Sequence, residues 1–136
     1  MSTMTALLRT GQSLPDIQSA HWLMRAALAA MIAYQGLTKF PLAASDAASF
    51  DVPFILWIMA AVGEVAAGIA LIAGGFGRTW IGDLVTRAGG AALAMIVASV
   101  LAVVYWAPPL DLFLGNQFHI LLLVGGLYFA LRGNKA

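Results

Sequence analysis

Four stretches of about twenty mostly apolar residues follow one another along this chain, at about 21–40, 53–76, 84–106 and 112–131. A helix needs about 20 such residues to cross the roughly 30 Å hydrocarbon core of a bilayer. A membrane-spanning strand needs only about 10 residues and alternates in polarity, which these stretches do not do. The pattern therefore predicts an all-α chain that forms an integral-membrane four-helix bundle.

The composition of the 136 residues indicates the same class of protein. Apolar residues make up 62% of the chain, charged residues make up 10%, and the mean hydropathy is +0.91. A typical soluble domain has about 25% charged residues, so this chain has too few polar side chains to cover a soluble globule. We expect residues 1–20 to form a cytoplasmic N-terminal segment and residues 21–132 to form the membrane domain.

The distribution of charge predicts how the bundle is oriented. With four spans, both ends of the chain lie on one side of the membrane, and that side holds six of the seven basic residues: Arg9, Arg25, Arg78, Arg87, Arg132 and Lys135. The other side holds Lys39 together with Asp46, Asp51 and Asp111. Because basic residues concentrate on the cytoplasmic side of membrane proteins, we expect an N-in/C-in topology.

Several classes of function are excluded by the residues that the chain lacks. There is no cysteine, so disulfides, iron–sulfur clusters and thiolate metal sites are excluded. The net charge is +1, which provides no basic surface for nucleic acid. The two histidines, His21 and His119, fall on opposite sides of the predicted membrane, so we expect no metal site and no covalently bound cofactor. A redox centre would have to come from a partner protein or a diffusible carrier.

Glu64 is the charged residue closest to the middle of a predicted span. A charge at that depth costs about 3 kcal/mol, so it should face protein or water. Arg25, Lys39 and Arg87 are the candidate partners for it. Arg25 has the better reach, and its guanidinium fork suits a carboxylate. Glu64 is interpreted in one of two ways. It forms a buried ion pair that holds the helices together, or it serves as a proton-relay carboxylate or as part of the wall of a ligand site.

A second polar group is predicted at the outer end of the bundle, beside aromatic residues. Its members are Gln35, Lys39, Tyr105, Trp106, Asn116, Gln117 and His119. The carbonyl oxygens of a quinone need one or two hydrogen-bond donors at headgroup depth, next to an apolar or aromatic groove. These residue types meet that need, although helix caps and interfacial aromatic belts produce the same set of residues.

The spacing of the glycines and charges resembles the DoxX family of small bacterial membrane proteins. The matching residues are Arg25, Gly36-x-x-Lys39, Gly63-Glu64-x-x-x-Gly68, Gly74 and Arg78, followed by Tyr105-Trp106 and Asn116-Gln117. The resemblance covers about residues 20–133. It implies a four-helix bundle in the bacterial inner membrane, with Arg25, Gly36, Lys39, Glu64, Gly68 and Arg78 at the family's motif positions. The family takes its name from a subunit of a terminal quinol oxidase, and related proteins accompany thiosulfate:quinone oxidoreduction.

Three functions follow as hypotheses. The first is an accessory membrane subunit of quinone-dependent electron transfer that has no redox centre of its own and works with a membrane-associated oxidoreductase. The second is a proton-coupled transporter of small solutes that uses Glu64 as its relay. The third is a structural scaffold that anchors other proteins or forms a homo-oligomer and binds no small molecule.

Overall fold

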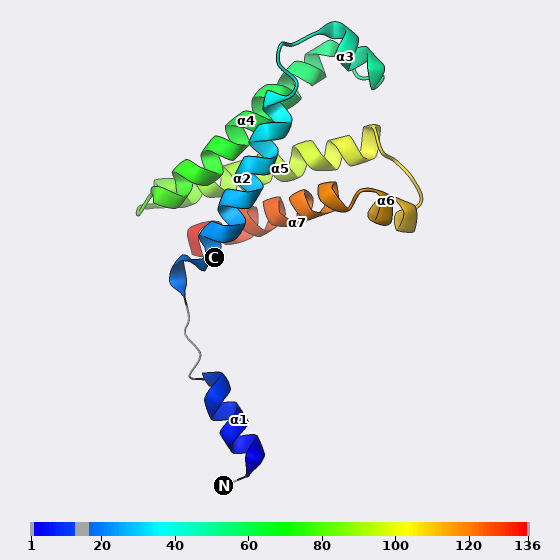
Figure 1. Ribbon diagram of the computed structural model, residues 1–136. Helices are drawn as coiled ribbons and strands as arrows, with labels where there is room; N and C mark the ends of the chain where they lie inside the picture. Colours follow the sequence, from blue (N-terminus) through cyan, green and yellow to red (C-terminus); the bar gives the residue numbers. More distant parts are fainter. Residues whose placement is uncertain (1, 13–16, 136) are drawn as a thin grey trace.

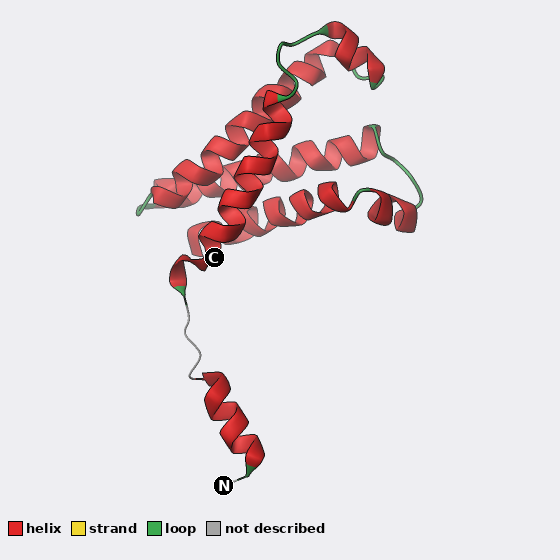
Figure 2. Cartoon of the chain, in the orientation of Figure 1, coloured by secondary structure: helices red, strands yellow, loops and turns green. Residues whose placement is uncertain are grey.

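The structure, a computed structural model, describes residues 2–12 and 17–135, and no strand occurs among them (Figure 2). The predicted all-α class is therefore confirmed for the described part of the chain. Its helices are α1 (Thr3–Gln12), α2 (His21–Leu37), α3 (Ala44–Ser49), α4 (Phe54–Phe76), α5 (Trp80–Val103), α6 (Pro109–Gly115) and α7 (Gln117–Arg132), with short 3-10 turns at Gln18–Ala20 and Gly133–Lys135. Residues 1 and 13–16 of the predicted N-terminal segment lie outside the described residues.

The four long helices form one assembly in which α4 packs against both α2 and α5, and α7 packs against α5 (Figure 1). Seen in Figure 1, α4 diverges from α5 and α7 toward the end that carries α3 and α6, whereas α1 lies apart from the other helices. Large apolar side chains from all four long helices fill the centre, among them Ile32, Leu71, Leu93 and Phe129. The core therefore lies where the four helices converge.

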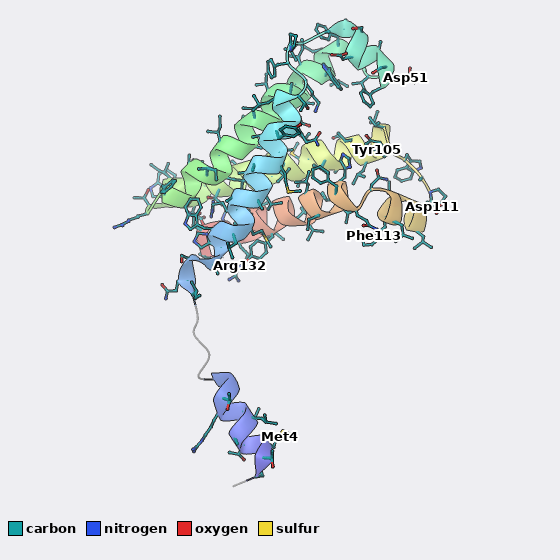
Figure 3. All side chains as sticks on the ribbon, viewed as in Figure 1. Met4, Asp51, Tyr105, Asp111, Phe113 and Arg132 are labelled. Atoms are coloured by element: carbon teal, nitrogen blue, oxygen red, sulfur yellow. The ribbon has the colours of Figure 1, made fainter. Side chains whose placement is uncertain are left out.

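The two ends of this assembly differ in charge, as Figure 3 shows with Asp51 and Asp111 at one end and Arg132 at the other. The basic end collects the start of α2, the end of α4, the start of α5 and the end of α7, which are joined by hydrogen bonds. The opposite end holds the loop between α2 and α4, which includes α3, and the loop between α5 and α7, which includes α6. The start of α2 and the end of α7 therefore lie at the same end of the assembly.

Two helices, α4 and α5, are long and apolar enough to cross a membrane. Three of the predicted helices differ from the observed ones. The helix expected over 84–106 begins and ends earlier, at Trp80 and Val103. The helix expected over 21–40 ends at Leu37, because residues 38 and 39 form a turn ahead of Pro41. The helix expected over 112–131 is broken at Asn116, where α6 meets α7 at an angle of 93°, and this pair counts as a third span only if it crosses as one bent element.

Glycines at the helix contacts bring the backbones close together. A Cβ atom added at Gly36 of α2 would lie 2.7 Å from the carbonyl oxygen of Ala61, and one added at Gly68 of α4 would lie 2.9 Å from that of Ala29. Small residues at helix contacts are typical of membrane bundles, since lipid provides no hydrophobic force to press helices together and close packing must do so. Both glycines are predicted motif positions, and both set the spacing between α2 and α4.

The contact between α5 and α7 provides a stability prediction. A Cβ atom at Gly90 would lie 2.6 Å from the backbone nitrogen of Ala130 and from the carbonyl oxygen of Gly126. Because these are backbone atoms of the facing helix, Gly90→Ala is expected to lower the free energy of unfolding by about 1–3 kcal/mol through overpacking. Unfolding in mixed detergent micelles would measure it. Gly115→Ala is the matched control, since a Cβ atom there would meet nothing within 4 Å; equal effects of both variants would contradict the prediction.

Candidate functional site

Lys39 and Glu64 form a nearly buried ion pair at the end of α2. The Lys39 Nζ lies 2.7 Å from the Glu64 Oε2, and their side chains are 14% and 6% exposed. The same ammonium donates to the carbonyl oxygen of Gln35 at 3.2 Å and lies 5.3 Å from the centre of the Trp57 ring. A cation at that distance from an indole face is attracted to it. The ammonium is therefore held by a carboxylate, a carbonyl and an aromatic ring together.

The expected preference of Glu64 for Arg25 is wrong in this structure. Gly36, rather than Arg25, faces Glu64 across the contact between α2 and α4. At about 1.5 Å per residue, Lys39 lies about 4.5 Å beyond that level along the chain and Arg25 about 16 Å before it. The Arg87 alternative is also wrong, because its guanidinium pairs with Asp83 at 2.8 Å. The close approach at Gly36 thus selects Lys39 as the partner.

The ion pair lines a cavity of about 430 Å³ between the diverging helices. Of the residues predicted to form an outer ligand site, Gln35, Lys39, Tyr105 and His119 line this cavity. The Tyr105 and His119 rings lie against each other, with centroids 5.0 Å apart. Pockets of about 300–1,000 Å³ with a few polar groups on apolar walls are typical of small-molecule sites. The structure therefore brings four of the seven predicted residues to one ligand-sized space.

The other three predicted residues lie elsewhere. Trp106 is 75% exposed and does not line the cavity. Asn116 lies at the break between α6 and α7, where its side-chain amide donates to the carbonyl of Leu112 at 3.0 Å. Gln117 is exposed at the first position of α7. These residues belong to the bend of the chain, which explains why polar residues occur there without forming part of the cavity.

Part of the cavity wall was not predicted. The short helix α3 and the residue after it place Asp46, Ser49 and Phe50 along the cavity. Phe50 stacks on Trp57, with ring centroids 5.6 Å apart. The residues of α3 have no helix-length apolar pattern, and only the fold of the loop between α2 and α4 brings them over the Lys39–Glu64 pair. In the sequence, this part of the wall is indicated only weakly, by two polar residues, Asp46 and Ser49, close to the aromatic Phe50.

Arg25 is instead the centre of a second polar cluster at the basic end of the bundle. Its side chain is fully buried, and it donates to the carbonyl oxygen of Leu71 at 2.6 Å, to the Thr86 hydroxyl at 3.0 Å and to the Asn134 side-chain oxygen at 2.9 Å. The guanidinium carbon also lies 4.8 Å from the centre of the Phe129 ring. Among the described residues no carboxylate lies within ion-pair distance of it. Neutral oxygens and ring faces therefore solvate this charge.

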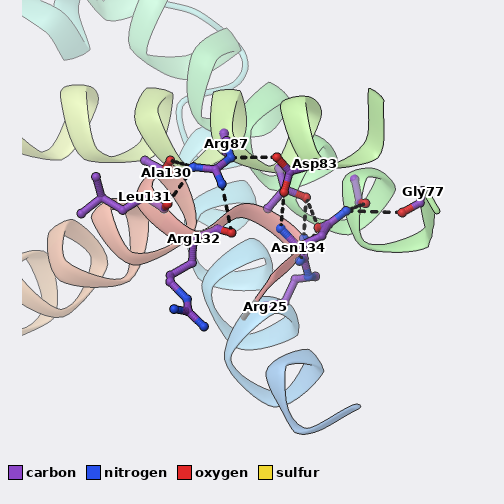
Figure 4. A network of polar contacts seen from close by, with 10 residues as sticks. Arg25, Gly77, Asp83, Arg87, Ala130, Leu131, Arg132 and Asn134 are labelled. Atoms are coloured by element: carbon purple, nitrogen blue, oxygen red, sulfur yellow. Dashed lines mark hydrogen bonds and ion pairs between the residues drawn. The ribbon is translucent and has the colours of Figure 1, made fainter. Parts of the chain in front are cut away.

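Asn134 ties the C-terminal end of the chain to this cluster (Figure 4). Its amide group donates to the carbonyl oxygens of Gly74 and Gly77, and its backbone N–H donates to Asp83 at 2.8 Å. Beside it, Arg87 donates to three carbonyl oxygens at the end of α7 and to Asp83. Basic groups near the last carbonyls of a helix satisfy acceptors that the helix leaves free. Asn134 and Thr86 were not predicted from the sequence, because they carry no charge to signal a role.

The remaining motif position, Arg78, is exposed in the turn between α4 and α5 and lines neither the cavity nor the cluster around Arg25. Within residues 2–12 and 17–135, no group of three or more His, Asp or Glu side chains is arranged to hold a metal ion. The cavity with the Lys39–Glu64 pair is thus the candidate ligand site, and the cluster around Arg25 is a packing site. Comparison with family models, with curated proteins and with solved structures finds no match to this chain.

Proposed function

We propose that this chain is a membrane subunit of quinone-linked electron transfer that binds the quinone head group in the cavity beside Lys39 and Glu64. The observation that carries the proposal is that cavity: about 430 Å³, lined by hydrogen-bonding groups together with aromatic and aliphatic side chains. The protein contributes no redox centre in this proposal. It holds the carrier for a membrane-associated oxidoreductase, in line with the resemblance to the DoxX family.

The chemistry of the wall suits an uncharged head group with carbonyl acceptors. The Lys39 ammonium, the Tyr105 hydroxyl and an N–H of the His119 ring are donors that line the same space. The Phe50 and Trp57 rings, which stack on each other, line the same space and provide aromatic surface for a planar ring. Donors and aromatic rings around one space are a combination that can orient a flat, dipolar molecule.

The proposed topology is four spans in the bacterial inner membrane, with both termini in the cytoplasm. The arginines at the basic end of the bundle support this orientation through the positive-inside rule. In the proposal, α2 crosses beside α4 and α5, and α6 and α7 cross together as one bent element. The 17 residues of α2 are at the lower limit for a membrane helix, which is about 17–25 residues. The cavity then lies toward the periplasmic side, within reach of a quinone at headgroup depth.

A proton-coupled transporter is the second candidate, because Glu64 lines the cavity and is nearly buried. A carboxylate relay must bind and release a proton in each cycle, whereas the Glu64 carboxylate is held 2.7 Å from the Lys39 ammonium. The contact therefore supports a fixed polar wall over a relay. Transport of a solute driven by a pH gradient in liposomes, lost in a Glu64→Gln variant, would favour the transporter instead.

Quinone binding to the purified chain in lipid nanodiscs tests the proposal. A benzoquinone with a decyl chain is expected to bind saturably, and His119→Phe is expected to weaken it about fivefold to tenfold, since one hydrogen bond contributes about 1–1.5 kcal/mol. Phenylalanine keeps the ring contact with Tyr105. The matched control is Arg78→Gln, which alters an exposed residue away from the cavity. Binding no greater than that of empty nanodiscs, or equal loss in both variants, would refute the head-group site.

The oxidoreductase partner is tested separately. Isolation from native membranes in a mild detergent, followed by identification of copurifying proteins and quinones, is expected to recover an oxidoreductase in stoichiometric amount. Recovery of the chain alone with lipid would argue against the accessory-subunit role and for the transporter or scaffold.

A further inference from the structure

An apolar groove of about 410 Å³ runs between α4 and α5, next to the polar cavity. Its walls are aliphatic side chains and methionines, and the one hydroxyl among them, on Ser99, already donates to the carbonyl oxygen of Met95 at 2.8 Å. The groove therefore offers no free donor to a polar ligand. It suits a hydrocarbon chain.

The groove and the cavity adjoin each other. Both are lined by the same five residues, which come from the start of α4 and the end of α5: Val52, Leu56, Ala60, Val100 and Val104. A molecule whose head group lies beside the Lys39–Glu64 pair can thus extend directly along α4 and α5. The groove is therefore placed to hold the rest of a molecule whose head group occupies the cavity.

The groove opens on the outer surface of the bundle. Three of its side chains, Met59, Met95 and Val103, are 61%, 70% and 66% exposed. In the proposed topology this surface faces the hydrocarbon of the bilayer. A lipid-soluble ligand therefore reaches the cavity sideways between α4 and α5, and its head group need not pass through either aqueous phase.

The charges of the cavity argue against a phospholipid as the occupant. One ammonium, on Lys39, faces two carboxylates, on Glu64 and Asp46, and the nearest of them is already paired with it. A phosphate in this space would meet net negative charge, which opposes binding. An uncharged head group with carbonyl acceptors meets no such repulsion.

We propose that the groove between α4 and α5 holds the isoprenoid chain of the quinone whose head group lies in the cavity. The inference rests on the proposed function and extends it: the ligand is an uncharged amphiphile with a long apolar tail, and it enters from the membrane. The first units of the tail lie in the groove, and the remainder lies in the bilayer.

The test compares two benzoquinones with the same ring, one with a decyl chain and one with only a methyl group, in nanodiscs of fixed lipid composition. Ser99→Trp fills the groove, and Ala98→Trp places the same side chain at an exposed position on a neighbouring face that lines neither space. Ser99→Trp is expected to weaken binding of the decyl quinone at least tenfold and to leave the methyl quinone within about twofold. Ala98→Trp should change neither. Elution from a sizing column and unaltered thermal unfolding verify that both variants are folded.

Each other outcome has a distinct meaning. Unchanged decyl quinone binding in Ser99→Trp places the tail elsewhere and overturns this inference, while the head-group site stands. Equal weakening of both quinones shows that the groove does not act on the tail and also overturns it. Failure of the unaltered protein to bind either quinone refutes the proposed function itself. Displacement of the decyl quinone by phosphatidylglycerol at a lower concentration than by phosphatidylcholine would overturn the assignment to an uncharged head group.

Discussion

Arg25→Ala is expected to lower the free energy of unfolding by about 3–5 kcal/mol, one of the two largest effects among single substitutions in this chain. The change removes three hydrogen bonds and leaves a cavity where a fully buried side chain contacts α4, α5 and the C-terminal turn. The loss would be measured by unfolding in mixed detergent micelles, followed by circular dichroism. Arg78→Ala, at an exposed arginine of the same end, should stay within about 0.5 kcal/mol of the unaltered protein.

Two further substitutions separate packing from hydrogen bonding at this position. Arg25→Met keeps most of the volume and removes the charge, so it should retain part of the lost stability. Arg25→Lys keeps the charge but lacks the planar fork that reaches three acceptors, so it should be less stable than Arg25→Met. If Arg25→Met unfolded at the same detergent fraction as the unaltered protein, the hydrogen bonds to Thr86 and Asn134 would contribute nothing to stability.

Removing one partner of the Lys39–Glu64 pair is expected to have the other large effect. Glu64→Gln or Lys39→Met alone should cost about 3 kcal/mol, because each leaves a nearly buried charge without its counterion. The value is at the low end of the range because the pair borders a cavity. The double variant should cost less than the sum of the two by at least about 1 kcal/mol, since it leaves no unpaired charge.

A double-mutant cycle on unfolding in mixed micelles measures this coupling. Asp111→Asn is the control, because it neutralises an exposed carboxylate of the same end and should change stability by less than about 0.5 kcal/mol. Additive effects of the two single changes would mean that the contact does not hold α2 against α4. Glu64 would then be free to serve as a relay, and the transporter hypothesis would gain support.

The fold class follows from the sequence because it depends on local properties. Runs of about twenty apolar residues require helices in a bilayer, where each backbone N–H and carbonyl must be satisfied within its own segment. The break in the last helix was not predicted, although Asn116 and Gln117 stand where it occurs. The Asn116 side-chain amide donates a hydrogen bond to the carbonyl oxygen of Leu112, and this local contact lies where α6 ends.

The partner of Glu64 depended on something that composition and helix periodicity do not contain, namely how far α2 is shifted along α4. Arg25, Lys39 and Arg87 were all candidate partners from the sequence. The close approach of Gly36 to Ala61 sets that shift and places Lys39 next to the carboxylate. It also moves Arg25 to Leu71, almost two turns of α4 away from Glu64.

The sequence by itself determined the helical class, the apolar lengths of α4 and α5 and the unequal distribution of charge between the two ends, because each is a sum over neighbouring residues. Only the tertiary structure decided which charges meet, that Asn134 joins Arg25, and that the cavity beside Lys39 adjoins a groove between α4 and α5. These features arise where residues far apart in the chain touch. The register of the helices, set by close backbone contacts, governs all of them.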